Sequence, residues 1–316
     1  MSAYLSNTQR PLGSEKLDRS ICAQFLFMHV ACLLVFWTGV STVAVVTCLA
    51  LYVIRMFAIT AGFHRLFAHR TYQSSRAFQF VMGFVGTASY QKGPLWWSSH
   101  HRRHHLYADT EQDLHSPLTH RVWRSHFGWF LSCESQATDW KLIANLSKYR
   151  DLRLLDRFYS LPPALLAVAM FLLGAVLERY APGLGTSRWQ MLVWGFFVST
   201  VILYHGTFTV NSLAHIFGKR RFATDDNSRN NWFVALITLG EGWHNNHHHY
   251  QSSERQGFYW WEIDISHYTL RALSWFGIVW DLRRPPAHVF ETNIRTQLVT
   301  ERQDSPATNE SLEPAA

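Results

Sequence analysis

Four long apolar segments interrupt an otherwise more polar chain of 316 residues. Each approaches the roughly 20 residues that a helix needs to cross the apolar core of a bilayer. They occupy residues 21–37, 40–62, 161–177 and 191–213. Only Thr38 and Gly39 separate the first two segments, so we expect those two to form a helical hairpin. The pattern predicts an all-α integral membrane protein with four transmembrane helices.

The polar sequence between the spans predicts a helical cap. The cap comprises 63–157 and 214–285, and with the spans it forms one domain of residues 21–285. Within it, Ala77–Tyr90 predicts a short interfacial or buried helix. Phe258–Leu282 carries four Trp among charged residues, which is typical of an amphipathic helix on a membrane surface. A helix in the core of the cap is the alternative for that segment.

Both ends of the chain are polar. Residues 1–20 lack the apolar run and small-residue cleavage site of a signal peptide, so we expect a polar N-terminal segment. Residues 286–316 are polar and contain Pro, and we expect this tail to be disordered. No internal repeat is visible.

Basic residues gather beside the spans. Lys and Arg number 29 against 22 Asp and Glu, which gives a net charge of +7. Such a balance can indicate nucleic-acid binding, but only 16% of the residues are charged, against about 25% in soluble domains. Because the basic residues flank the spans, the positive-inside rule places both termini and the cap in the cytoplasm. We therefore expect membrane lipid as a partner, in a bacterial inner membrane or an endoplasmic reticulum equivalent, and no nucleic acid.

Histidine is the unusual residue, with 18 copies. Eight of them form three clusters with regular spacing, and His215 follows Asn211 by four residues. The clusters are His64 and His69; His101, His104 and His105; and His244, His247 and His248. In the last two clusters the i, i+3, i+4 spacing projects three imidazoles from one side of a helix. Residues five apart, like the first pair, lie about 140° apart on a regular α-helix. That pair therefore serves one centre only if the helix ends between them; the alternative is that the two residues serve two metals.

So many converging imidazoles must be mostly neutral, since imidazolium ions repel one another, and neutral imidazole is a metal ligand. The clusters and His215 supply nine ring nitrogens, which exceeds the need of one zinc ion and suits two metal ions with a place for water or O2. Iron, copper, zinc and nickel all accept imidazole, so the ligand type alone leaves the metal open. We expect Glu241 to orient one of the imidazoles through a hydrogen bond.

The three clusters, read as HRLFAH, HRRHH and GEGWHNNHH, closely resemble those of the membrane fatty-acyl desaturases of the stearoyl-CoA desaturase type, over roughly residues 45–285. The resemblance implies a cytosolic cap that holds two iron ions, and O2-dependent insertion of a cis double bond, at the delta-9 position, into a saturated acyl chain. It places the nine metal-ligating His on the residues named above and a water-mediated ligand on Asn211. It also implies that Trp97, Gln91 and Thr207 bend the acyl chain, and that Asp113 and His115 support the ligands.

Two residues on the second span predict where a substrate tunnel ends. Tyr52 and Met56 lie one turn apart toward the middle of that span. We expect them to close the tunnel and limit the length of the acyl chain. Lipid-facing or core packing is the alternative.

Departures from the resemblance bear on two questions: which group carries the acyl chain, and which protein supplies the electrons. Animal enzymes hold coenzyme A with an Arg-Asp and an Arg-Lys pair, where this chain has Ser99-His100 and Cys133-Glu134. Acyl-CoA stays the favoured thioester, with a phospholipid or a carrier-protein ester as alternatives. The chain shows no cytochrome b5 motif, so a separate donor of cytochrome b5, ferredoxin or rubredoxin type, with its reductase, is expected. The basic residues Arg102, Arg103, Lys219 and Arg220 predict a surface for an acidic donor or for anionic lipid.

Two rival functions share some of these features. A hydroxylase, or a decarboxylase that forms a terminal alkene, would use the same site with a different outcome. A His-rich metal transporter would instead carry ionisable ligands near the middle of its spans. The His clusters lie beyond the span ends, which argues against transport.

Overall fold

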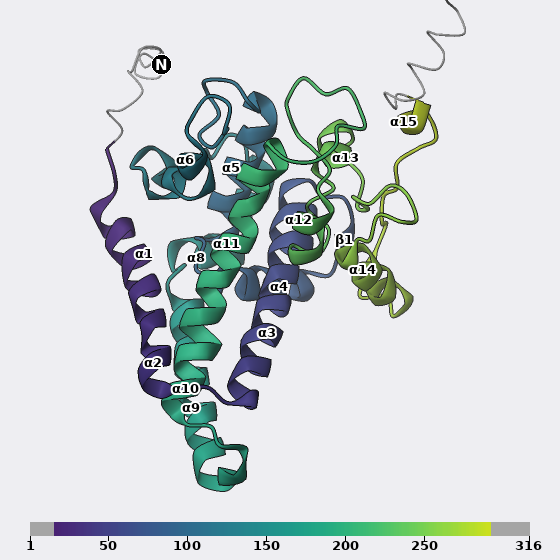
Figure 1. Ribbon diagram of the computed structural model, residues 1–316. Helices are drawn as coiled ribbons and strands as arrows, with labels where there is room; N and C mark the ends of the chain where they lie inside the picture. The colour runs from purple at the N-terminus through teal and green to yellow at the C-terminus, as the bar shows by residue number, and fades with distance from the viewer. Residues whose placement is uncertain (1–15, 292–316) are drawn as a thin grey trace, which may run out of the picture.

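The computed structural model describes residues 16–291 and is mainly helical (Figure 1). Long helices form a stem, and short helices and loops form a cap at one end of it. Four helical segments are long and apolar enough to cross a membrane: Arg19–Thr38, Thr42–Ala68, Leu161–Tyr180 and Arg188–His215. The prediction of an all-α, four-span membrane protein is confirmed.

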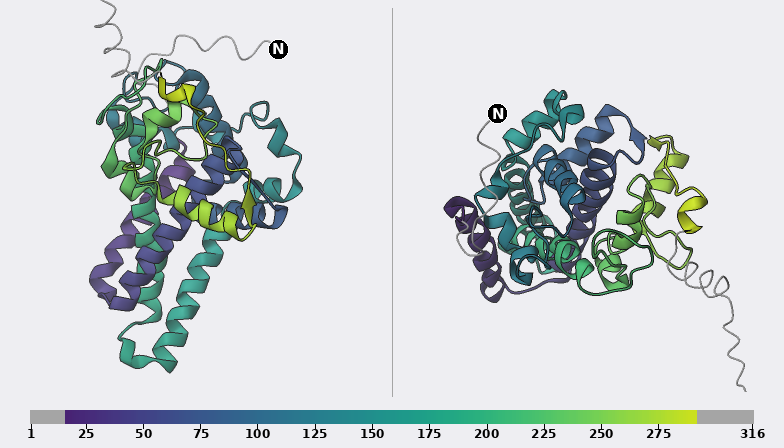
Figure 2. Two further views of the ribbon diagram at one scale, coloured as in Figure 1. Left: turned by 90° about the vertical axis from the view of Figure 1, so that its right-hand side faces the viewer. Right: turned by 90° about the horizontal axis from the view of Figure 1, so that it is seen from above.

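Each span is assembled from one or more helical elements. The first contains α1 (Arg19–Ala31), the 3₁₀ turn η1 (Cys32–Leu34) and α2 (Val35–Thr38); the second contains α3 (Thr42–Phe57) and the π-helix η2 (Ala58–Ala68). The third is α9 (Leu161–Tyr180), and the fourth contains α10 (Arg188–Leu192), the π-helix η6 (Val193–Val198), α11 (Ser199–Ser212) and the 3₁₀ turn η7 (Leu213–His215). Figure 2 shows that the connection between α9 and α10 lies furthest from the cap.

Local chemistry explains where the first two spans begin and end. The Asp18 carboxylate accepts from the Ile21 N–H at the start of α1, and the Ser41 hydroxyl accepts from the Ala44 N–H at the start of α3. Gly39 lies between the two spans with φ of 69°, a conformation that suits glycine. The predicted hairpin is therefore present.

The cap is built from short elements. Its helices are α4 (Arg76–Thr87), α5 (Pro94–Tyr107), α6 (Val122–His126), α7 (Ala144–Ser147), α8 (Arg150–Arg157), α12 (Trp232–Ile237), α13 (His244–His249), α14 (Ile265–Trp275) and α15 (His288–Glu291). The 3₁₀ turns η3 (Gly128–Leu131) and η4 (Glu134–Gln136) lie between α6 and α7, and η5 (Pro182–Leu184) joins α9 to α10. Strands β1 (Gln73–Ser74) and β2 (Val279–Trp280) pair antiparallel. Helix α4 confirms the helix predicted at Ala77–Tyr90.

The fourth span is the centre of the stem. In its apolar window 56% of the residues are buried, against 17% in the first span. Arg55 of α3 is buried and ties the second span to the fourth, since its guanidinium donates to the Ser199 and Thr200 hydroxyls and to the Ala88 carbonyl. These neutral oxygens replace the water that the guanidinium loses on burial.

The helix predicted over Phe258–Leu282 is wrong in its extent. Only α14 is helical, because the Asp264 carboxylate caps its start by accepting from the His267 N–H. Gly277, at φ of 66°, follows its end, and the chain then enters β2, which pairs with β1. Trp260 and Trp275 nevertheless remain exposed, so contact of this segment with a membrane surface stays a prediction.

The two polar ends lie largely outside the described residues. Of the predicted N-terminal segment, only 16–20 are described, and they lead into α1. Of the predicted disordered tail, 286–291 include the short helix α15, in which Val289 is buried. That part of the tail is ordered, and the prediction for the rest is untested.

Candidate metal centre

A π-helix positions the first pair of histidines. Element η2 continues α3 with i to i+5 hydrogen bonding, and the His69 N–H donates to the His64 carbonyl at 3.1 Å. Because a π-turn takes in more residues than an α-turn, residues five apart lie nearly above one another. The 140° separation expected for a regular α-helix is therefore wrong, and both imidazoles reach the same group.

The other two clusters lie on α5 and α13, with His215 at the end of the fourth span. Nine imidazoles from these elements gather in two adjacent groups. The five-His group is His64, His69, His101, His105 and His247, and the four-His group is His104, His215, His244 and His248. Each HxxHH motif thus divides its side chains between the two groups, which sequence spacing alone did not predict.

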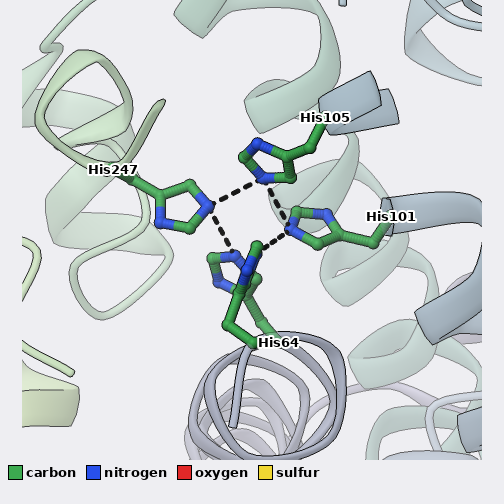
Figure 3. A group of neighbouring side chains, drawn as sticks. His64, His101, His105 and His247 are labelled. Carbon is green, nitrogen blue, oxygen red and sulfur yellow. Dashed lines mark hydrogen bonds between the residues drawn. The ribbon is translucent and has the colours of Figure 1, made fainter. Parts of the chain in front are cut away.

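The ring nitrogens of the five-His group lie close to one another (Figure 3). The Nε2 atoms of His64 and His247 are 3.0 Å apart, and those of His247 and His105 are 2.9 Å apart. His101 Nε2 lies 3.0 Å from His105 Nε2 and 2.7 Å from His69 Nε2. Side chains from the second span, α5 and α13 therefore converge on one point.

The four-His group lies beside it and is fully buried. The Nε2 atoms of His215 and His244 are 3.0 Å apart, and the His244 and His248 rings lie 4.3 Å apart between centroids. Only 4.4 Å separates the rings of His105 and His248, which belong to different groups. The two groups are therefore neighbours within one site.

The spacing of these nitrogens fits bound metal ions. With metal–nitrogen bonds of about 2.1 Å, adjacent ligands of an octahedral ion lie about 3.0 Å apart. The Nε2–Nε2 distances of 2.7 to 3.0 Å in the five-His group match that value. His248 Nε2 is buried among the other rings with no hydrogen-bond partner among the described residues. Each group could hold one metal ion.

Four carboxylates hold the far sides of these rings. Asp113 lies 2.9 Å from His104 Nδ1, Asp109 lies 3.0 Å from His215 Nδ1 and Asp226 lies 2.6 Å from His248 Nδ1. Glu241 forms an ion pair with His64 Nδ1. Such carboxylates fix the tautomer and orientation of a ligand imidazole. The contacts made by Asp113 and Glu241 agree with the sequence expectation.

Asp109 and Asp226 were missed by the sequence reasoning. Asp109 lies four residues after the second cluster, which is a usable signal, but Asp226 reaches His248 only through the loop before α12. His115, expected as a supporting residue, contacts Asp113 at 3.4 Å and packs on the His104 ring at 4.5 Å.

Burial sets the protonation of these rings. Burial is the main cause that holds five of the imidazole pKa values well below the ordinary range, and the neighbouring imidazoles lower them further. The five residues are His69, His101, His105, His244 and His247. His104 differs, because the Asp113 carboxylate outweighs the effect of burial and raises its pKa. The five imidazoles are therefore neutral near pH 7, which is the form that binds a metal.

A buried ionic network supports the five-His group. The Arg65 guanidinium donates to Glu241 Oε1 at 3.0 Å and to Asp264 Oδ1 at 3.0 Å, and it also donates to the Glu254 carbonyl. Gln256 Nε2 lies 3.2 Å from His64 Nδ1. Glu241 is therefore fixed from both sides, by Arg65 and by the imidazole that it orients.

Two cavities meet beside the histidines. They share Trp97, His101, Thr207 and Asn211. The first also contains Gln91, whose Oε1 accepts from the Thr207 hydroxyl at 3.1 Å. The structure thus brings the predicted bending residues together, and Asn211 lines both cavities.

The second cavity extends toward the second span. Met56 is fully buried and lines this cavity. Tyr52 does not line it, and its hydroxyl donates to the Ile237 carbonyl at 2.6 Å. A Cβ atom on Gly206 would lie 2.6 Å from the Tyr52 hydroxyl and 3.0 Å from Met56 Cε. Tyr52 and Met56 therefore pack closely against the fourth span at this end of the cavity.

Three further histidines form a separate chain. His205 lies 3.1 Å from His29 and 3.0 Å from His126, whose Nδ1 lies 2.9 Å from the Ser212 hydroxyl. These rings are partnered polar groups at the contact of the first span, the fourth span and α6. They are separate from the two metal groups.

One part of the predicted basic surface has a different role. The Arg102 guanidinium donates to the Phe67, Ala68 and Leu142 carbonyls at 2.7 to 2.9 Å, so it joins segments of the cap. Lys219 and Arg220 remain exposed. A donor surface that depends on Arg102 is therefore not supported.

Comparison with known proteins decides the family. Residues 40–280 match the fatty acid desaturase family. The chain belongs to this family. Its curated relatives include sn-1 stearoyl-lipid 9-desaturases of Synechocystis sp. and of Anabaena variabilis. The first is 37% identical over 290 residues, 90% of this chain and 86% of that protein; the second is 34% identical over 262 residues, 82% of this chain and 91% of that protein.

A plant relative acts on a different acyl carrier. The acyl-CoA C20 delta5-desaturase of Anemone leveillei is 34% identical over 262 residues, 82% of this chain and 79% of that protein. The desaturase is accordingly an oxidoreductase that acts on fatty acyl chains, in an iron-dependent family, and its relatives differ in what carries the acyl chain.

Proposed function

We propose that this desaturase uses two iron ions and O2 to insert a cis double bond at the delta-9 position of a saturated acyl chain. The observation that carries the proposal is the meeting of two cavities at the two His groups. His64, His101, His104 and His244, drawn from both groups, line the second cavity. An acyl chain in that cavity would pass both candidate metal positions.

The nine His, with Asn211 acting through water, are the proposed ligands. Mid-chain methylenes carry no acidic proton, so two bound irons, reduced by an external donor, would supply with O2 the oxidising power that removes two hydrogens. Burial keeps most of these rings neutral. Asp109, Asp113, Asp226 and Glu241 orient four of the rings through the imidazole nitrogens that face away from the metal positions.

Selection of the bond would come from shape, because neighbouring methylenes are chemically alike. Trp97 stacks on His101 at 5.1 Å between centroids, and Thr207, which lines both cavities as they do, donates its hydroxyl to Gln91 in the first cavity. A chain that follows both cavities bends there. A displacement of about 1 Å can cost ~100-fold in rate, so this fixed bend can define the reacting position.

The part of the second cavity near Met56 would set the length of the acyl chain. Replacing Met56 by Ala removes a buried side chain from the cavity wall and lengthens the space for the methyl end of the substrate. We expect products of Met56→Ala to shift toward longer acyl chains, measured by gas chromatography–mass spectrometry of cellular lipids. An unchanged chain-length distribution would contradict this role, and Val53→Ala, on an exposed position of the same helix, is the control.

The reductant and the orientation complete the proposal. A separate protein of cytochrome b5, ferredoxin or rubredoxin type would deliver the electrons on the cytoplasmic side, and the basic residues beside the spans support that orientation of the cap. Lys219 and Arg220 are exposed positions for an acidic donor.

Analysis of lipids from cells that express the chain tests the function directly. Wild type should yield a new cis-monounsaturated acid, and His247→Ala should yield none. Equal unsaturation in both would overturn the proposal. A hydroxy acid or a terminal alkene in place of the olefin would instead assign the hydroxylase or decarboxylase activity.

A further inference from the structure

One indole of the first cavity lacks a hydrogen-bond partner. Trp129, in the 3₁₀ turn η3, lines this cavity and is only 7% exposed. Its Nε1 atom has no acceptor among residues 16–291. An indole nitrogen can only donate, and native proteins seldom leave a buried donor without an acceptor, because the lost hydrogen bond to water is not replaced. This N–H therefore fits a ligand that brings an acceptor into the cavity.

The neighbouring indole shows the contrast. Trp96 lines the same cavity and stacks on Trp129 at 5.8 Å between centroids. The Trp96 Nε1–H donates to the Ser135 carbonyl at 2.6 Å. Both indoles are buried, so burial alone does not explain why one of them has an acceptor and the other has none. The acceptor for Trp129 has to come from outside the described chain.

The turn η3 holds the Trp129 ring in place. Gly128 allows close packing before it, since a Cβ atom on Gly128 would lie 2.5 Å from Trp123 Cζ3. The Trp129 carbonyl accepts from the Ser132 N–H at 3.1 Å and from the Ser132 hydroxyl at 2.9 Å. The indole packs edge to face with His115 at 4.8 Å between centroids. The ring is thus ordered before a ligand binds, which lowers the entropic cost of a contact.

Other polar atoms of the first cavity are less suited to accept this role. Gln91 Nε2 also lacks a partner among the described residues, but Gln91 is bonded to Thr207, which lines both cavities. His100 Nε2 lacks one too, yet an imidazole nitrogen donates or accepts according to its tautomer. Trp129 is the residue of this set that donates in every protonation state and lines the first cavity alone.

The position of Trp129 identifies the part of the substrate that it meets. The two cavities share the proposed metal ligand His101, and the second cavity continues to Met56. An acyl chain that follows both cavities would therefore have one end near Met56 and the other near Trp129. The methyl end carries no polar atom, whereas the other end carries a carbonyl oxygen, which is an acceptor. The carbonyl end matches the cavity with the unpaired indole N–H.

The distances are of the right size for a bond in the middle of the chain. The His115 ring lies 4.8 Å from Trp129 and 4.5 Å from the proposed ligand His104, between centroids. A fully extended peptide advances at most ~3.6 Å over three bonds, so eight carbon–carbon bonds span roughly 10 Å. Two successive ring contacts cover a similar length. A carbonyl at Trp129 is therefore compatible with reaction near the ninth carbon.

We propose that the Trp129 Nε1–H donates a hydrogen bond to the carbonyl oxygen of the acyl substrate, and that this contact fixes how many carbons separate the carbonyl from the reacting bond. The inference rests on the proposed function and adds a specificity-determining residue to it. It holds for thioester and ester carriers alike, because both present the same carbonyl oxygen. The bend at Trp97 and Thr207 sets where the chain turns, and Trp129 sets which carbon reaches the bend.

The contact is tested by infrared spectroscopy of the full chain in detergent. The probe is methyl stearate, isotopically labelled at its carbonyl carbon, which has neither a nucleotide nor a lipid headgroup. A hydrogen bond lowers the carbonyl stretching frequency, so the band of the bound probe should lie below that of the probe in detergent alone. Trp129→Phe keeps an aromatic ring but deletes the N–H, so it should restore the higher frequency and weaken binding by up to about tenfold.

The controls separate this contact from a general effect on the cap. Trp140→Phe changes an exposed indole outside the cavity and should leave the band as in wild type. Octadecane, which lacks the carbonyl, should bind alike to wild type and Trp129→Phe. An unshifted band in wild type would overturn the inference even if Trp129→Phe fails to fold, and so would an equal shift in wild type and a folded Trp129→Phe.

Product analysis separates this inference from the proposed function. In cells, wild type should place the double bond at one distance from the carbonyl in both palmitoyl and stearoyl chains, and Trp129→Phe should spread it over neighbouring positions. A constant distance from the methyl end in wild type, or a single unchanged isomer in Trp129→Phe, would reject the carbonyl contact while the desaturase proposal stands. A shifted carbonyl band with no double bond formed by wild type would reject the desaturase proposal and leave the contact standing.

Discussion

The five-His group and the four-His group lie side by side but are built differently. In the five-His group three rings are partly exposed, and one ring, His64, has a carboxylate on its far side. In the four-His group all rings are buried, and three of them have a carboxylate partner. One group has more ligands, and the other has better-supported ligands.

This difference has a physical consequence for metal binding. A carboxylate that accepts from the outer nitrogen of an imidazole raises the basicity of the inner nitrogen and fixes the ring before a metal arrives. Burial also slows the approach of water and of chelators. We therefore expect the four-His group to hold its metal more tightly and to release it more slowly than the five-His group.

Removing one ligand from each group should produce the largest effect. His247→Ala and His244→Ala should each lose product below detection and retain about one metal ion per chain. The ion that remains in His247→Ala lies in the four-His group and should resist a chelator, whereas the ion in His244→Ala should be removed. Inductively coupled plasma mass spectrometry, after treatment with increasing chelator concentrations, measures the metal that each variant retains. The reverse order of release would contradict the expectation that the four-His group holds its metal more tightly.

Removing a supporting carboxylate should have an intermediate effect. Asp226→Asn leaves His248 in place but deprives its Nδ1 of an anionic partner. Changes of this kind typically cost about 10–100-fold in metal affinity. We expect a loss of this size for the ion in the four-His group and none for the ion in the five-His group. Asp225→Asn alters the exposed neighbouring carboxylate and should leave both ions as in wild type. If the two variants released metal alike, the carboxylates would not explain the difference between the groups.

Changing the extra histidine of the third cluster should have the smallest effect. His249 stacks on Phe222 at 4.2 Å between centroids and lies outside both groups. His249→Gln should leave the metal content of both groups within about twofold of wild type, because a group of four or five other imidazoles is untouched. Metal analysis under the same chelator series is the measurement, and loss of one ion would add His249 to the ligands.

Much of the site was predictable because its signals are local. Apolar runs of about 20 residues encode the spans, and the i, i+3, i+4 spacing places His101, His104 and His105 on one side of α5 whatever the rest of the chain does. The contact of Glu241 with an imidazole was also expected. The π-helix was not, since the α-period used for His64 and His69 is wrong in η2.

The sequence by itself determined the membrane architecture, the nine histidines and the chemistry that neutral imidazoles allow, because each depends on residue type and short-range periodicity. The tertiary structure decided which imidazole joins which group, and that Asp109 and Asp226 support them. Those features depend on how α5, α13 and the spans cross, and residues such as Asp109 and His215, 106 positions apart, meet only after packing. Contacts of that kind leave no periodic signal in the chain.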